Sequence, residues 1–348
     1  MADAVRFAIV GLGMGRGRAD RCIETEGAEL AAICDLSEER GTAASGELGV
    51  PWVRSYDELL ARDDVDVIGL WTPSGTHGAM AVQALQAGKH VCMTKPMDIT
   101  AAACDRAIHE ADSRGLLLGI DFQERYLPAN HRVKSAVDSG AVGRLLRADL
   151  RMFWFRGQAY YDAGMPQAWR SRLDTEGGSL ANQAVHFVDL LLWWAGTPER
   201  VVGCRGTYGH DIETEDGTSA VVQFREGAVG SIVTTTCAVP NRGHEVTLSG
   251  TWGTLTWENA EEMTLEHVPE GARSAADAFR VDGKPEVVVG DLGAYAIPPD
   301  LPDNIFADMV GAIRTGSALQ CDGREARRSV ALFDAVYRSS DTGAWVEV

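Results

Sequence analysis

Lys95 is the first residue of this sequence whose type and position point to chemistry. It follows the short apolar run 90–93 and precedes Pro96, so we expect it where a strand ends. A lysine there can hold a substrate hydroxyl by its charge, or exchange a proton if burial lowers its pKa. A lysine on the protein surface is the more common case, so Lys95 alone does not define a site.

Asn182 and His186 form a second candidate group. They lie four residues apart in a tract that we expect to be helical over 178–194, and that spacing places two side chains on one helix face. An imidazole can exchange a proton near neutral pH, whereas an amide can only donate and accept hydrogen bonds. The alternative for His186 is a histidine packed in the core of an apolar helix.

A glycine-rich string, GLGMGRGRAD, follows the apolar run 5–10 and opens a helix expected over 16–26. Gly11 and Gly13 begin a dinucleotide fingerprint, in which the first glycine permits a tight turn and the second lets the backbone approach a pyrophosphate. The helix N-terminus adds free N–H groups and the positive end of the helix dipole. Because the third fingerprint position is Arg16, a flexible strand–helix turn is the alternative interpretation.

Asp35 ends the apolar run 29–34, 20 residues after Gly15. A carboxylate there would accept hydrogen bonds from the adenosine ribose hydroxyls and would repel a 2′-phosphate. This position favours NAD over NADP. Arg16 or Arg40 could still reach a phosphate, and a plain helix-entry residue is the other reading of Asp35.

Composition excludes several classes of protein. A chain of 348 residues corresponds to about two domains. With 32 basic and 50 acidic side chains its net charge is −18, which argues against general binding to nucleic acid or anionic membranes. No apolar run approaches the ~20 residues that span a bilayer, and the first residues lack the features of a secretory signal. Seven scattered cysteines without a C-x-x-C pair favour reduced thiols in the cytosol and no metal site.

The first third of the sequence alternates strands and helices. Such alternation predicts an α/β fold with a parallel sheet covered by helices on both faces. We expect Ser37 to cap one helix and Gly115 to end another. The expected strands are 5–10, 29–34, 65–71, 90–93 and 116–120, and the expected helices are 16–26, 37–48, 76–87 and 100–114.

The pattern changes after about residue 125. Strand-like runs in series with polar turns predict an α+β domain with a largely antiparallel sheet. Residues 269–300 show the least pattern and are expected to form a long loop. The expected strands are 145–155, 201–207, 219–224, 228–236, 245–249 and 253–257, and the expected helices are 128–138, 178–194, 304–314 and 325–339.

Motifs in both halves resemble one known family. Residues 71–96 read WTPSGTHGAMAVQALQAGKHVCMTKP, and residues 159–194 read AYYDAGMPQAWRSRLDTEGGSLANQAVHFVDLLLWW. With the glycine-rich string, they resemble the glucose–fructose oxidoreductase / inositol dehydrogenase / MocA (Gfo/Idh/MocA) family. The resemblance implies an N-terminal Rossmann domain with a doubly wound parallel sheet over 1–125. It also implies an α+β domain over 126–348 with a large, mostly antiparallel open sheet that binds substrate and forms oligomers.

The resemblance also implies roles for individual residues. Lys95 matches the catalytic lysine of the family's E-K-P motif, although Thr94 stands here in place of the glutamate. His186 matches the usual proton acceptor or donor, and Asn182, where the family often has aspartate, would orient it. The residues expected to bind cofactor are Gly11, Gly13, Met14, Gly15, Asp35, Thr72, Pro73, His77 and Lys95. Those expected to bind substrate are Arg125, Tyr161, Trp169, Arg170, Asn182 and His186, with core packing as the alternative for the aromatic ones.

The sequence therefore predicts a cytosolic, NAD-dependent oxidoreductase. Hydride would pass between nicotinamide and a secondary carbinol of a sugar, inositol or glycoside. The expected partners are that small substrate and further copies of the chain in a homodimer or homotetramer, with no nucleic acid, membrane or metal. One alternative is an enzyme that recycles tightly bound NAD to cleave glycosides or rearrange sugars. Another is a non-enzymatic regulator that senses NAD.

Overall fold

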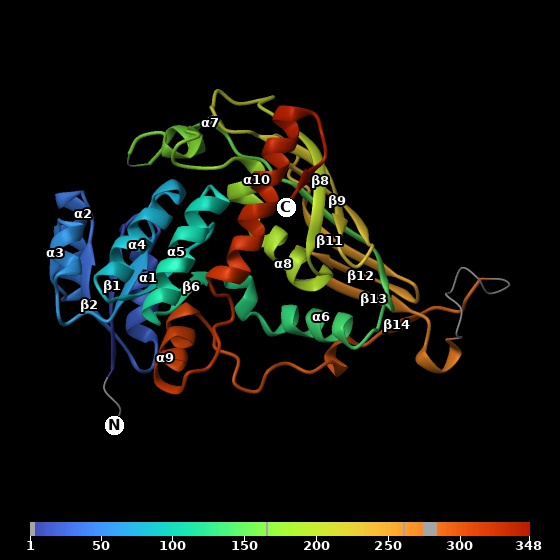
Figure 1. The fold of residues 1–348 in the computed structure, drawn as a ribbon, viewed down its shortest axis with the longest axis horizontal. Coiled ribbons are helices and arrows are strands. Elements are labelled where there is room, and N and C mark those ends of the chain that lie inside the picture. The colour runs from blue at the N-terminus through green and yellow to red at the C-terminus, as the bar shows by residue number, and fades with distance from the viewer. Residues whose placement is uncertain (1–3, 165, 260–261, 274–283) are drawn as a thin grey trace.

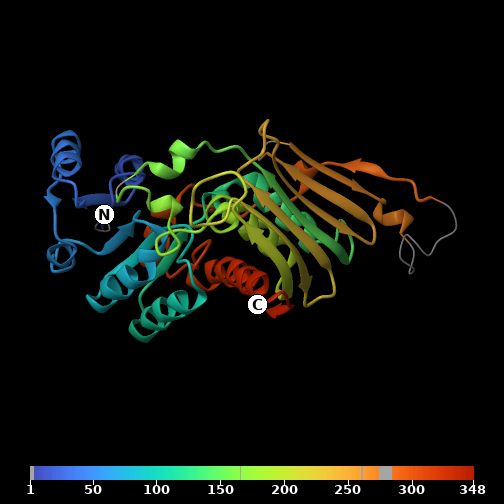
Figure 2. The same ribbon diagram turned by 90° about the horizontal axis from the view of Figure 1, so that it is seen from above.

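The computed structural model describes residues 4–164, 166–259, 262–273 and 284–348, which form two sheets lying side by side (Figures 1 and 2). Within these ranges no helix is long and apolar enough to cross a membrane. The elements of the first sheet are the strands β1 (Val5–Val10), β2 (Ala28–Cys34), β3 (Trp52–Val53), β4 (Val67–Leu70), β5 (His90–Thr94) and β6 (Leu118–Asp121), and the helices α1 (Gly15–Glu24), α2 (Glu38–Leu48), α3 (Tyr56–Leu60), α4 (His77–Gln86) and α5 (Ala101–Arg114).

The first sheet has the order β3-β2-β1-β4-β5-β6 in the described part of the chain, and all of its strand pairs are parallel. Alternate residues of β1 enter two different cores. Ala8 and Val10 pack in the core that contains α4 and α5, whereas Phe7 and Ile9 pack in the core that contains α1. The predicted doubly wound parallel sheet is therefore confirmed, because helices bury both faces.

Local signals set the helix ends that the sequence predicted. Ser37 accepts a hydrogen bond from the backbone N–H of Arg40 and caps α2, and Gly115 ends α5 in the left-handed conformation. The strand β3 and the helix α3 were not predicted. With two and five residues, they are too short for a hydrophobic period to appear in the sequence.

The second sheet has the order β14-β13-β12-β11-β7-β10-β9-β8-β15 in the described ranges. Only β7 and β10 pair in parallel there, so the predicted mostly antiparallel sheet is confirmed. The strands β13 to β15 were not predicted. The elements of this part are β7 (Leu145–Phe153), β8 (Pro198–Gly206), β9 (Gly217–Phe224), β10 (Val229–Thr235), β11 (Gly243–Gly250), β12 (Gly253–Glu258), β13 (Glu262–His267), β14 (Val288–Gly290), β15 (Val346–Glu347), α6 (Pro128–Asp138), α7 (Gln158–Asp162), α8 (Val185–Ala195), α9 (Ile305–Thr315) and α10 (Gly323–Thr342).

The last two long helices return to the first sheet. The ring of Phe306 in α9 lies 5.3 Å from that of Phe7 and 5.8 Å from that of Trp71. The long helix α10 contacts both α5 and β8, and so lies between the two sheets (Figure 1). The division of the chain at residue 125 stays a prediction, because these late segments complete the packing of the first sheet.

Candidate active site

The glycine-rich loop between β1 and α1 has the geometry that a dinucleotide needs. Gly11 has a positive φ of 87°, and a Cβ there would lie 2.5 Å from the carbonyl oxygen of Trp71, so only glycine fits. A Cβ on Gly13 would meet no protein atom within 4 Å. The surface of the loop at Gly13 is therefore open to a pyrophosphate at the N-terminus of α1, and Met14 is exposed beside it.

The departure at Arg16 has a structural explanation. A Cβ on Gly15 would lie 3.2 Å from the side chains of both Ile9 and Trp71, so the close helix–strand contact falls on Gly15. The glycine that this contact requires lies at position 15, one residue before the usual fingerprint position. Arg16, which occupies that position, pairs with Asp20 and Glu47. The chain therefore keeps the packing function of the third fingerprint glycine.

Asp35 ties the end of β2 to this loop. Its buried carboxylate accepts hydrogen bonds from the backbone N–H groups of Leu12 and Ser37, each at 2.7 Å, and from Arg40 at 2.9 Å. The carboxylate is thus fixed at the strand end where a ribose hydroxyl would approach. Together with Gly11, Gly13 and Gly15, this arrangement fits NAD.

We expect Gly11→Ala to weaken NAD binding at least about tenfold and to destabilise the protein by about 1–2 kcal/mol, because the methyl group meets the Trp71 carbonyl in a left-handed conformation. NADH fluorescence titration and urea unfolding measure the two effects. Gly17→Ala is the matched control, since Gly17 has open space around its Cβ position and lies in α1. Unchanged NAD affinity in Gly11→Ala would contradict the assignment of this loop.

The loops after β4 and β5 are joined by His77. Its ring nitrogens contact the carbonyl oxygens of Pro96 and Thr72, each at 2.8 Å, and the side chain is buried. Thr72 also hydrogen-bonds to Thr76 through its hydroxyl. His77 therefore positions the Thr72–Pro73 and Lys95–Pro96 segments, whereas the sequence suggested a direct contact with cofactor.

Lys95 reaches the second domain from the carboxyl end of β5. Its Nζ donates a 2.8 Å hydrogen bond to the backbone carbonyl of Asn182. Burial lowers the pKa of Lys95 to about 8; the carboxylate of Glu176 opposes this shift, Arg156 adds to it, and Asp121 also opposes it. The lysine thus lies among charges supplied by both parts of the chain.

None of these three charged groups was predicted from the sequence. Asp121 ends β6 beside Thr94, is buried, and lies 3.2 Å from the guanidinium of Arg18. Burial raises its pKa to about 6, against the charges of Arg18 and Lys95. Asp121 could have been predicted from its position at the end of a buried strand, the same feature that pointed to Asp35. Glu176 is buried too, with an Oε2 that has no partner among the described residues, and no motif marks it.

His186 is a neutral imidazole. Burial lowers its pKa well below the usual value, and the charges of Lys95 and Arg18 lower it further. Its Nδ1 is buried and has no hydrogen-bond partner in the described part of the chain. Phe122, just after β6, packs edge-on against the ring. A neutral imidazole held against an aromatic wall beside a lysine can accept a proton.

The expectation of one continuous helix through Asn182 and His186 is wrong. Residues Ser179–Gln183 form a π-helical turn, and α8 begins only at Val185. The backbone N–H of Ala184 donates to Ser179, five residues earlier, and Phe187 then donates to Ala184. The break leaves the carbonyl of Asn182 to accept from Lys95. Such π-turns often occur at functional sites.

Arg125 lies in a buried ion pair. Its Nε and Nη2 atoms donate to the two carboxylate oxygens of Asp189 at 2.6 and 2.9 Å, and its guanidinium lies 4.3 Å from the Trp193 ring centroid. The side chains of Arg125 and Asp189 are 3% and 1% exposed. Because both partners are occupied by each other, this geometry favours a structural role for Arg125 over the predicted contact with substrate.

We expect Asp189→Asn to lower the free energy of unfolding by about 3–5 kcal/mol, because it leaves the Arg125 charge buried without its main partner. Urea unfolding measures the change. Asp174→Asn is the control, since Asp174 pairs with Arg172 on the surface, where such a pair contributes at most about 1 kcal/mol. Equal losses in the free energy of unfolding for the two variants would show that the buried ion pair stabilises the protein no more than the surface pair does.

Of the predicted substrate platform, Tyr161 and Trp169 are buried and Arg170 is half-buried. The hydroxyl of Tyr161 hydrogen-bonds to that of Thr236 at 2.7 Å, so packing accounts for this tyrosine. Arg170 contacts two rings, that of Trp169 and that of the adjacent Tyr160, which the sequence did not single out.

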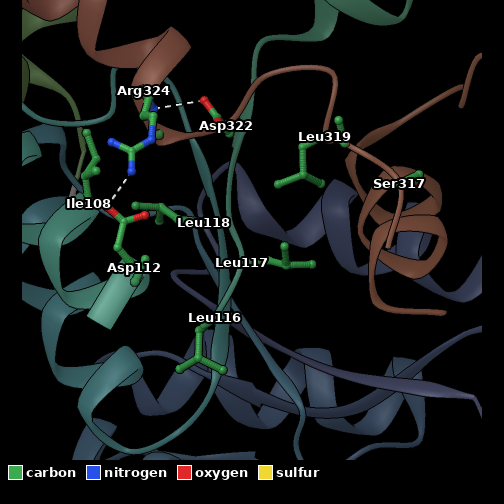
Figure 3. A pocket seen from close by; sticks show the side chains of 12 residues that line it. Ile108, Asp112, Leu116, Leu117, Leu118, Ser317, Leu319, Asp322 and Arg324 are labelled. Atoms are coloured by element: carbon green, nitrogen blue, oxygen red, sulfur yellow. Dashed lines mark hydrogen bonds and ion pairs between the residues drawn. The ribbon is translucent and has the colours of Figure 1, made fainter. Parts of the chain in front are cut away.

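A pocket and a group of possible metal ligands lie outside the group of residues around Lys95 and His186. A pocket of about 250 Å³ lies at the amino end of β6, opposite the edge that holds Lys95, and includes Leu116, Leu118 and Arg324 (Figure 3). A group of possible metal ligands, His210, Asp216 and Cys237, lies near Tyr161. Asp216 already accepts from three backbone N–H groups, and burial raises the pKa of Cys237 to about 11, so the thiol stays protonated.

Comparison with known proteins accounts for both domains. Residues 5–122 match the oxidoreductase family with an NAD-binding Rossmann fold, and residues 130–256 match the Gfo/Idh/MocA C-terminal domain. The chain is 30% identical over 264 residues to dTDP-3,4-didehydro-2,6-dideoxy-alpha-D-glucose 3-reductase of Streptomyces violaceoruber, covering 75% of this chain and 72% of that protein. The chain belongs to the Gfo/Idh/MocA oxidoreductase family. Residues 5–122 thus form its NAD-binding domain.

Other Gfo/Idh/MocA relatives match over nearly the whole chain. The 1,5-anhydro-D-fructose reductase of Ensifer adhaerens is 28% identical over 331 residues, covering 94% of this chain and 93% of that protein. The WlbA dehydrogenase of Bordetella pertussis, solved with NADH and UDP-GlcNAcA, is 30% identical with a TM-score of 0.84, covering 99% of both chains. These proteins are oxidoreductases, as is this member of the family.

Proposed function

We propose that this chain transfers hydride between NAD and a secondary carbinol of a sugar or polyol. The observation that carries the proposal is the hydrogen bond from Lys95 Nζ to the Asn182 carbonyl, which joins the carboxyl edge of the NAD-binding sheet to the turn that leads into His186. The names of the relatives, a reductase of 1,5-anhydro-D-fructose among them, support a sugar-like substrate.

In this proposal His186 takes the proton of the substrate hydroxyl at Nε2, because Nδ1 is buried. Lys95, as an ammonium ion, donates a hydrogen bond to the same oxygen and stabilises the negative charge that develops on it. Asn182 fixes the position of Lys95 through its backbone carbonyl. When bound, NAD supplies the acceptor for the hydride that leaves the carbinol carbon, or its donor in the reverse direction.

A substrate screen tests this function. Inositols, aldoses and glycosides are offered with NAD or NADP, and NADH formation is followed by absorbance. We expect turnover with at least one polyol or sugar and preference for NAD, since the Asp35 carboxylate is fixed directly after β2. Release of an aglycone without added NAD would instead favour a recycled cofactor, and absence of turnover with every compound would argue against the proposal.

We also propose a cytosolic homodimer or homotetramer. Val221 and Val229 are exposed on neighbouring strands of the second sheet, where a second copy can cover them. The seven cysteines are unpaired, which is typical of a reducing compartment. Light scattering after size exclusion measures the oligomeric state, and a monomer at micromolar concentration would contradict the proposal.

A further inference from the structure

Two arginines contact the same aromatic ring. The guanidinium carbon of Arg156 lies 5.3 Å from the Tyr160 ring centroid, and that of Arg170 lies 4.9 Å from the same centroid. Arg156 also lies 4.9 Å from the ring of Trp154, and Arg170 lies 4.4 Å from that of Trp169. Aromatic faces therefore hold both guanidinium groups in place.

Hydrogen bonds connect Arg156 and Tyr160 to the residues of the proposed reaction. Gln183 accepts from Arg156 Nε at 3.0 Å and donates to the Tyr160 hydroxyl at 2.8 Å. The same amide donates to the side chain of Asn182, whose carbonyl holds Lys95. Arg156 is thus hydrogen-bonded into the same group as the lysine, and Arg170 joins this group through its contact with the Tyr160 ring.

The charges of these two arginines are not neutralised. In the described ranges, neither guanidinium has a carboxylate within 4.0 Å, although the chain carries 50 acidic residues. Arg172, two residues after Arg170, shows the contrast, because it pairs with Asp174 at 2.8 Å. Arg156 is also close enough to Lys95 to lower the pKa of that lysine. Arg156 and Lys95 therefore place two positive charges at the proposed site, beside the carboxylates of Glu176 and Asp121. Arg170 adds a third positive charge on the Tyr160 ring that it shares with Arg156.

We propose that Arg156 and Arg170 bind an anionic group of the substrate, so that the enzyme acts on a sugar acid, a sugar phosphate or a nucleotide sugar. This inference rests on the proposed function and names its substrate class. A guanidinium group presents a planar fork that matches the oxygens of a carboxylate or phosphate, and a half-buried site strengthens such a bond. An anion there also offsets the repulsion between Arg156 and Lys95.

Steady-state kinetics with matched substrates tests the inference. D-glucose is compared with D-glucuronate, D-glucose 6-phosphate and UDP-glucuronate at saturating NAD, and the binding of each to the NADH-loaded protein is titrated. We expect at least one anionic compound to have a kcat/KM at least about tenfold above that of glucose. Preference for glucuronate identifies a carboxylate ligand, whereas preference for the phosphate-bearing compounds identifies a phosphate.

Substitutions then assign the effect to the two arginines. We expect Arg156→Gln and Arg170→Gln each to raise KM for the anionic compound about tenfold or more, with a smaller change in kcat and a smaller rise in KM for glucose. Arg170→Lys should restore part of the affinity, because it keeps the charge. Arg172→Gln is the control for the same segment, since its guanidinium is exposed and paired. Circular dichroism and NAD binding verify that each variant folds.

Two results would overturn the inference while leaving the proposed function intact. One is turnover of neutral sugars with no preference for any anionic compound. The other is an anion preference that survives in both Arg156→Gln and Arg170→Gln, which would show that these arginines only pack against the aromatic rings. Failure of every compound to yield NADH would count against the proposed function instead.

Discussion

Replacement of His186 by alanine is expected to lower turnover by about 10²–10⁴-fold while NAD still binds. The ring is neutral because burial and the charges of Lys95 and Arg18 hold its pKa well below the usual value. It can therefore accept the hydroxyl proton throughout the neutral range. Substrate oxidation without this base must release the proton to water, which is slow in a site lined by Phe122.

Turnover is measured by NADH absorbance, and cofactor binding by quenching of tryptophan fluorescence. His109→Ala is the matched control, because His109 is exposed on the helix α5. A turnover near that of the unmodified protein in His186→Ala would remove the histidine from the mechanism. A loss of NAD binding to the same degree would point to a structural role.

Turnover is also expected to depend on the proton of Lys95. Burial lowers the pKa of this lysine to about 8, so kcat/KM should fall as the pH rises through about 8 and the ammonium ion loses its proton. Lys95→Ala should lower kcat by about 10²–10³-fold, the usual effect of removing one donor to a developing oxyanion. It should also abolish the fall near pH 8.

Asp121→Asn gives this prediction a second readout. The Asp121 carboxylate raises the pKa of Lys95, so its removal should move the fall in kcat/KM to lower pH. Lys134→Ala is the control for loss of a lysine, since Lys134 pairs with Asp138 on the surface of α6. A fall near pH 8 that persists in Lys95→Ala would assign the titration to another group.

Much of the site was predictable because it follows strand ends. Gly11, Asp35 and Lys95 each come directly after a buried apolar run, and the carboxyl ends of parallel strands meet at one edge of a sheet. Asp121 obeys the same rule at the end of β6 and was overlooked because no motif accompanied it. Strand ends therefore predicted an edge at which the structure brings these residues together, and the assignment of this edge to cofactor stays a prediction. Gly15 shows that a motif can keep its packing function with its glycine shifted by one residue.

The contacts that join the two domains were not predictable from the sequence. A run of apolar residues around His186 is compatible with a π-turn as well as with an α-helix. The sequence therefore did not show that the backbone carbonyl of Asn182 is free to accept a hydrogen bond from Lys95. Arg125 and Asp189 are 64 residues apart, and nothing local shows that they pair rather than bind substrate. Tyr160 stands next to Tyr161, and only the tertiary structure decides which ring is buried.

The packing of α9 on the first sheet sets a constraint on the order of synthesis. Phe7 and Trp71 leave the ribosome more than 200 residues before Phe306, the ring that covers them. Until then one face of the NAD-binding sheet is only partly covered, and the nascent chain must keep that apolar surface from other chains. The cofactor domain is thus translated first but completed last.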